Sequence, residues 1–292
     1  MTEFDIDITN IPTPCYLVDE RLLQKNMEVL KSVSDKTGCR ILLAQKAFSM
    51  FSVYPLIGEY LSGATASGLY EAKLAHEYMK GENHIFSPAY KENEIDEIAS
   101  ICGHVVFNSF SQLKRFGERV RKQGASVGLR INPEHSTQQG HEIYDPCAKG
   151  SRLGIPLSSF KPELLEGVEG LHFHTLCEQN TDALSETLKV VEEKFGPYMK
   201  QMKWINFGGG HHITRSDYDI AILTLNGERV DASEYEYLIY KGKKYPSWKQ
   251  RGLVCFADDI ESCEYAKEMM LKKYISHSMK NIKKQLMISL LN

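Results

Sequence analysis

The segment ILLAQKAF, residues 41–48, places an apolar run directly before the polar pair Gln45 and Lys46. Such a run is typical of a buried β-strand whose last residues reach a polar edge. In a parallel α/β barrel this edge carries the active site, because the loops that follow the strands converge there. A lysine held there is partly withdrawn from water, which favours its neutral, nucleophilic amine. The alternative is an ordinary strand-end lysine that extends into solvent.

Similar apolar runs recur along the chain and alternate with helical stretches, a pattern typical of βα units around a parallel sheet. We expect further strands at residues 63–67, 84–86, 104–107, 127–131, 171–174 and 204–207. We expect helices at residues 19–38, 109–123 and 181–195. Counted from Ile41, about seven strands result, one fewer than the eight of a closed barrel.

The composition excludes several classes of protein. The chain has 292 residues and a formal net charge of −3, so no overall basic field points to nucleic acid. No apolar run approaches the roughly 18 residues of a membrane span, and the acidic N-terminus lacks a signal pattern. Its seven cysteines form no CxxC pair, so neither a disulfide framework nor a zinc cluster is expected. We therefore expect a cytoplasmic protein without membrane, nucleic-acid or metal partners.

The character of the sequence changes near residue 220, which predicts a barrel domain at residues 1–219 and a divergent segment at 220–292. Residues 253–257 form one more strand candidate. Residues 261–291 are expected to form an amphipathic helix with an apolar stripe and a lysine-rich face. Such a helix can lie on a membrane surface, but docking of its stripe on the barrel is the favoured interpretation.

Two segments after predicted strands contain residues suited to cofactor binding. In WINFGGGHHIT, residues 204–214, Gly208, Gly209 and Gly210 allow backbone N–H groups to close around a phosphate, or simply form a tight turn. In LHFHTLCEQN, residues 171–180, His172 and His174 share one strand face. A ring there can stack on a planar cofactor, bind a metal together with residues 211 and 212, or belong to the core.

A third polar region lies in GLRINPEHS, residues 128–136, and YDPCAKGSRLG, residues 144–154. It contains Arg130, Glu134, Asp145 and Arg152, which follow a predicted strand and precede a glycine-containing loop. Charges in this pattern suit a barrel mouth, although each one is equally consistent with a solvated loop position.

Eight segments together resemble one family: PTPCYLVDE, LLAQKAFS, SGATASGLYEAKLA, FNSFSQL, LRINPE, YDPCAKGSRLG, LHFHTLCEQN and NFGGGHHIT. In this order they resemble the carboxynorspermidine/carboxyspermidine decarboxylases. These are pyridoxal-phosphate (PLP) enzymes of fold type III, in the alanine racemase and ornithine decarboxylase superfamily. The resemblance covers residues 10 to 219.

The resemblance implies a TIM-like (β/α) barrel that works as a homodimer in polyamine biosynthesis. By the same resemblance, Lys46 forms the Schiff base with PLP, and His174 stacks on the pyridine ring. Gly208, Gly209 and Gly210 help to hold the phosphate, and Arg152 helps to line the pocket. The implied reaction removes carbon dioxide from a carboxylated triamine and gives norspermidine or spermidine.

The sequence departs from the family pattern after Gly210. It lacks the Glu-Pro-Gly segment whose glutamate pairs with the pyridine nitrogen, and residues 220–292 do not align with the family's C-terminal β-domain. Cys255 and Asp258 are a faint match to catalytic residues of that domain. We therefore expect an incomplete barrel whose β-domain is missing or replaced. Two alternatives stay open: a non-catalytic PLP-binding barrel or inactive truncated relative, and a metal-dependent barrel hydrolase built on His172 and His174.

Overall fold

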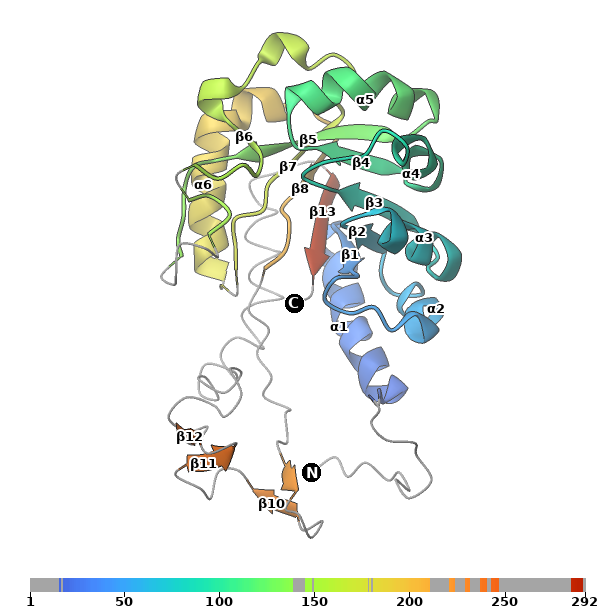
Figure 1. Cartoon of the computed structure of the whole chain (residues 1–292), viewed down its shortest axis with the longest axis vertical. Helices are drawn as coiled ribbons and strands as arrows, with labels where there is room; N and C mark the ends of the chain where they lie inside the picture. Colours follow the sequence, from blue (N-terminus) through green and yellow to red (C-terminus); the bar gives the residue numbers. More distant parts are fainter. Residues whose placement is uncertain are drawn as a thin grey trace. The chain divides into compact units, whose positions relative to one another are not determined.

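The computed structural model describes the greater part of the chain between residues 16 and 210 (Figure 1). The described residues are 16, 18–138, 145–148, 150–177, 179 and 181–210, together with the backbone of five strands at 221–223, 229–231, 237–240, 243–246 and 285–290. The chain divides into two compact units, residues 20–212 with 269–292, and residues 1–19 with 213–268.

The first unit contains a parallel sheet that closes on itself (Figure 1). Its strands are hydrogen-bonded in the order β4-β3-β2-β1-β13-β8-β7-β5. The last strand, β5, also pairs with the first, β4, and this pair closes the ring. The strands are β1 (Arg40–Ala44), β2 (Gly63–Ala66), β3 (Glu82–Phe86), β4 (His104–Phe107), β5 (Ser126–Asn132), β7 (Gly170–His172), β8 (Trp204–Asn206) and β13 (Gln285–Leu290). A short strand, β6 (Ile155–Pro156), adds to β5. The expected TIM-like α/β barrel is confirmed.

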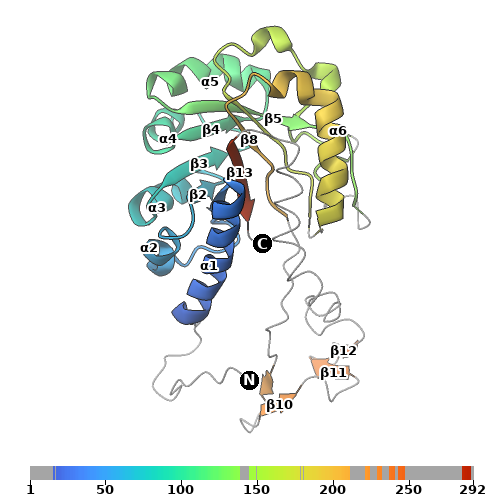
Figure 2. The ribbon, with the colours of Figure 1, turned by 180° about the vertical axis from the view of Figure 1, so that it is seen from behind.

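Helices cover the outside of this sheet, as views from both sides show (Figure 1 and Figure 2). They are α1 (Glu20–Thr37), α2 (Tyr54–Ile57), α3 (Leu69–Tyr78), α4 (Ile95–Ile101), α5 (Phe110–Lys122) and α6 (Thr181–Met199), with 3₁₀ turns at Phe51–Val53, Leu157–Ser159 and Pro162–Leu164. Each longer helix buries an apolar stripe in the main core; in α5 the stripe is Leu113, Phe116 and Val120. None of the described helices has the length and apolar character to cross a membrane.

One prediction from the sequence is wrong in this unit. Residues 285–290, assigned to an amphipathic helix, form strand β13, which pairs in parallel with both β1 and β8. The lysines of the segment end at Lys284, and QLMISL itself carries no charge. A short uncharged apolar run suits a buried parallel strand as well as a helix turn, and here two unpaired strand edges provide partners for it. The other residues of the predicted helix lie outside the described part.

The second unit is described only through two antiparallel strand pairs. Strand β9 (Ala221–Leu223) pairs with β10 (Arg229–Asp231), and β11 (Tyr237–Tyr240) pairs with β12 (Lys243–Pro246). The strand candidate at residues 253–257, together with Cys255 and Asp258, lies outside the described residues, as do residues 211 and 212. The proposed boundary at residue 219/220 stays a prediction.

The inside of the barrel holds a small apolar layer of its own, formed by Leu42, Val106 and Trp204 with Phe86 packed against them. The indole of Trp204 lies over the neighbouring strands β7 and β5. A Cβ atom on Gly170 would come within 2.1 Å of the indole, and one on Gly128 within 2.2 Å. These two glycines therefore provide the space that the indole fills.

We predict that Gly170→Ala lowers the free energy of unfolding by about 1–3 kcal/mol, because the added methyl group overpacks the barrel interior. Urea denaturation measures this change. Gly103→Ala is the matched control, since a Cβ atom there meets nothing within 4 Å. Equal stabilities of the two variants would contradict the packing role of Trp204.

Candidate active site

The loops that follow β7 and β8 are joined by hydrogen bonds at the carboxyl end of the barrel. The backbone N–H of Gly209 donates to Nδ1 of His174 over 3.0 Å. The N–H of Gly208 donates to Oδ1 of Asn206 over 2.8 Å, and the carbonyl of Gly210 accepts from the N–H of Gln179 over 3.2 Å. The glycine loop and His174 therefore lie together.

Two of the three glycines occupy backbone conformations and spaces that other residues avoid. The φ angles of Gly208 and Gly210 are +73° and +88°. A Cβ atom on Gly208 would lie 2.6 Å from the carbonyl oxygen of Phe173, and one on Gly210 would lie 2.1 Å from that of Leu176. The backbone consequently approaches its neighbours without side chains in between, while the N–H groups of Gly208 and Gly209 donate to Asn206 and His174.

Beneath this loop, His172 and Asn206 form a buried polar pair on neighbouring strands. Nδ1 of His172 lies 3.1 Å from Oδ1 of Asn206, so the ring donates its Nδ1 proton to the amide oxygen. Burial, assisted by the nearby Arg130 cation, lowers the pKa of His172 to about 3. His172 is therefore neutral at physiological pH, and Asn206 links it to the glycine loop through the same oxygen.

Arg130 is a buried cation beside this pair. It is 4% exposed, and its Nη2 donates to the backbone carbonyl of His174 over 3.3 Å. Its guanidinium stacks over the ring of Phe86 at 4.7 Å, and its Nε has no hydrogen-bond partner among the described residues. Burial lowers the pKa of Arg130 to about 10, so the side chain still carries its charge at neutral pH. Its described contacts are with neutral groups.

Lys46 lies two residues beyond the end of β1, in a turn that backbone hydrogen bonds stabilise. The N–H groups of Ala47 and Phe48 both donate to the carbonyl of Ala44. The preceding Gln45 is buried, and its side chain donates to the carbonyl of Thr65 over 3.3 Å. Lys46 is exposed, in contrast to the expected withdrawal of its amine from water, and its charge contributes after that of Arg130 to lowering the pKa of His172.

Arg152 is less closely connected to the other predicted residues. Its side chain is exposed, and its backbone carbonyl accepts a 2.8 Å hydrogen bond from Nδ2 of Asn108. The same loop borders a cavity of about 320 Å³ lined by Asn132, Glu134, Cys147, Ala148, Gly150, Ser151 and Pro156. Glu134 adopts a left-handed φ of +50°, a conformation that costs energy in a residue other than glycine and often marks a functional loop.

Sequence reasoning did not single out Asn206, and it treated Arg130 only as one of several mouth charges. Both residues interrupt apolar strands, in WINF and GLRIN, where a polar residue facing the barrel interior needs a partner. That interruption was the available signal. Among the described residues, His172 and His174 belong to no group of three or more possible metal ligands, so this part of the chain gives the hydrolase hypothesis no support.

Comparison with known proteins agrees with this architecture. No protein-family model matches the chain. A carboxynorspermidine/carboxyspermidine decarboxylase of Campylobacter jejuni is 51% identical over 210 residues, which is 72% of this chain and 54% of the relative. A carboxyaminopropylagmatine decarboxylase of Synechocystis is 34% identical over 272 residues, which is 92% of this chain and 70% of the relative.

The chain belongs to the carboxynorspermidine/carboxyspermidine decarboxylase family. A crystal structure of carboxynorspermidine decarboxylase from Campylobacter jejuni, complexed with norspermidine, superposes with a TM-score of 0.69 at 38% identity. That match covers 96% of this chain and 60% of the solved one. The chain thus spans about half to three fifths of these Campylobacter relatives' length.

We predict that Asn206→Ala lowers the free energy of unfolding by about 1–3 kcal/mol, because His172 and the N–H of Gly208 lose their shared buried acceptor. Chemical denaturation measures the loss. Asn26→Ala, at an exposed position of α1, is the control and is expected to leave stability within about 0.5 kcal/mol of the parent chain. An Asn206→Ala variant as stable as the parent chain would argue against the pairing of Asn206 with His172.

Proposed function

We propose that the barrel mouth binds PLP and that the chain serves PLP-dependent decarboxylation in polyamine biosynthesis. The observation that carries the proposal is the hydrogen bond from Gly209 to His174, which joins a ring suited to stacking with a glycine loop suited to phosphate. Lys46 follows β1 at the carboxyl end of the same barrel.

The described residues fit this cofactor. At Gly208 and Gly210 a Cβ atom would overlap backbone atoms, so glycine keeps side chains from standing between this backbone and a ligand. The buried Arg130 has an unpaired Nε and no described carboxylate partner, and an anionic ligand offsets the cost of burying such a charge. Under the proposal Lys46 would hold PLP through its amine, the His174 ring would stack on it, and Gly208 to Gly210 would hold the phosphate. Arg152 lines the pocket from its loop.

The proposed substrate is a carboxylated triamine, carboxynorspermidine or carboxyspermidine, and the products are carbon dioxide and norspermidine or spermidine. When bound, PLP accepts the electron pair that the departing carboxylate leaves behind. The amine of Lys46 would hold the cofactor and would be the group that carries a proton during the reaction. The neutral His172 and Asn206 keep the glycine loop in place below, and the Arg130 cation favours anionic groups at the mouth.

The complete activity requires more than the described mouth. The family resemblance implies a homodimer in the cytoplasm, with a second domain that completes the partner's site. Both the dimer and the activity are part of the proposal. The alternative is a non-catalytic PLP-binding barrel, and it is favoured by the missing Glu-Pro-Gly segment after Gly210. Without an acidic partner the pyridine nitrogen is less readily protonated, which weakens the cofactor as an electron acceptor.

We predict that the purified chain with PLP gains the visible absorption band of a protein-bound Schiff base. Lys46→Ala should lack the band because it removes the attacking amine, whereas Lys114→Ala, on the exposed face of α5, should retain it. Borohydride reduction followed by peptide mass mapping identifies the modified lysine. A parent chain without a band, or with the label on another lysine, would contradict the PLP site.

A second measurement separates the enzyme from the binding protein. We predict carbon dioxide release from carboxynorspermidine or carboxyspermidine by the PLP-loaded chain, and at least a 1,000-fold lower rate in Lys46→Ala, since nucleophilic lysines act through covalent attachment. Carboxyaminopropylagmatine tests whether the preference follows the Synechocystis relative instead. A chain that shows the band but releases no carbon dioxide from any of the three is the non-catalytic barrel.

A further inference from the structure

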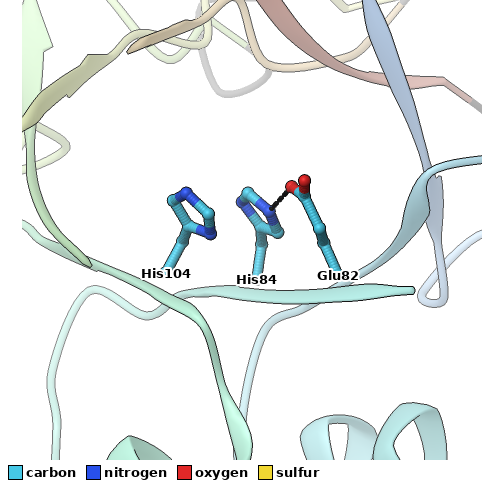
Figure 3. A group of neighbouring side chains, drawn as sticks. All are labelled: Glu82, His84 and His104. Carbon is cyan, nitrogen blue, oxygen red and sulfur yellow. Dashed lines mark hydrogen bonds and ion pairs between the residues drawn. The ribbon is translucent and has the colours of Figure 1, made fainter. Parts of the chain in front are cut away.

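Three possible metal ligands lie together inside the barrel, at the amino-terminal ends of β3 and β4 (Figure 3). Glu82 and His84 are two residues apart on β3 and therefore share one face of the strand. His104 is the register partner of His84 on the neighbouring strand. One ligand atom from each of the three residues lies within 4.8 Å of those from the other two. This group is distinct from the residues of the barrel mouth.

Not every polar atom of this group has a hydrogen-bond partner among the described residues. Nε2 of His84 lies 2.7 Å from a carboxylate oxygen of Glu82, and the rings of His84 and His104 stack at 3.9 Å with an interplanar angle of 8°. Nδ1 of His104 is buried and has no hydrogen-bond partner among the described residues. A buried ring nitrogen without a partner costs free energy, and a ligand that binds there would recover it.

The charges around the group are balanced in pairs. Arg40 forms an ion pair with the second oxygen of Glu82, and Glu169, whose negative charge acts on His104, pairs with Lys203 and accepts a hydrogen bond from Ser126. A neutral imidazole ring offers the lone pair of one nitrogen to a metal ion. Arg40 opposes an additional positive charge and therefore limits the affinity.

We propose that Glu82, His84 and His104 bind one divalent transition-metal ion of the zinc class. Two imidazole nitrogens and one carboxylate oxygen form a common zinc ligand set, and the fourth position is open to water. With bonds of about 2.0–2.1 Å, tetrahedral ligands lie roughly 3.4 Å apart, so the stacked rings must rotate to bring their nitrogens to one ion. The ion replaces the proton on Nε2 of His84, which moves through solvent to Nδ1 of the same ring, and it gives His104 the partner that it lacks. The proposal is independent of PLP and of the reaction.

The test is zinc binding by the full chain after removal of metal with a chelator. Isothermal titration calorimetry and elemental analysis after gel filtration should find one zinc ion per chain. His84→Gln and His104→Gln should each weaken binding at least tenfold, and so should the near-isosteric Glu82→Gln. His76→Gln, at an exposed position of α3, is the matched control and should bind as the parent does. Circular dichroism verifies that each variant is folded.

X-ray absorption spectroscopy of the zinc-loaded parent chain keeps the test decisive if a variant fails to fold. Two imidazole nitrogens with oxygen ligands at the zinc support the site, and fewer than two imidazoles overturn it. The proposal is equally overturned if the parent chain binds no stoichiometric zinc, or if folded His84→Gln and His104→Gln variants bind it as the parent does.

Discussion

The apolar layer inside the barrel separates two polar regions, and much of the described structure depends on it. Trp204, Leu42, Val106 and Phe86 fill the middle of the interior. The edge of Trp204 contacts His104 on one side at 5.4 Å, whereas Phe86 contacts His172 at 5.4 Å on the other. A filled layer excludes water from both sides. The polar groups next to it are consequently desolvated, which is the common cause of the low pKa values of the buried histidines.

The sequence predicted most of the barrel because its strands are short apolar runs separated by helices of ordinary length, and that periodicity depends on local burial alone. Lys46, His174 and the glycine loop could be selected as candidates in the same way, since each lies at or just after the end of a predicted strand; their roles stay predictions. The pairing of Asn206 with His172 and the juxtaposition of His84 with His104 were not accessible. They depend on the register between separate strands, which a single sequence does not specify.

Strand β13 is the clearest case in which tertiary context overrides a local pattern. Without it, β1 and β8 would each leave a row of backbone groups unpaired at the edge of the sheet. Strand β13 pairs with β1 from Arg40↔Met287 onward and with β8 from Gln285↔Trp204 onward. These two ladders give the backbone groups of both edges their hydrogen-bond partners. The ring is thus closed by residues 79 or more positions beyond the end of β8, so the integrity of the mouth depends on the C-terminal end of this chain.

The charge balance at the mouth sets a condition on any ligand. Arg130 is buried with its charge intact, its described contacts are the His174 carbonyl and the Phe86 ring, and its neighbour His172 is neutral. A buried cation without a carboxylate is costly, and a second cation beside it is costlier. Under the proposed function, a ligand at the mouth therefore gains from bringing a negative group, such as a phosphate or a carboxylate, close to Arg130. A polycationic triamine can meet this condition only with its amino groups directed away from Arg130 and its carboxylate toward the barrel floor.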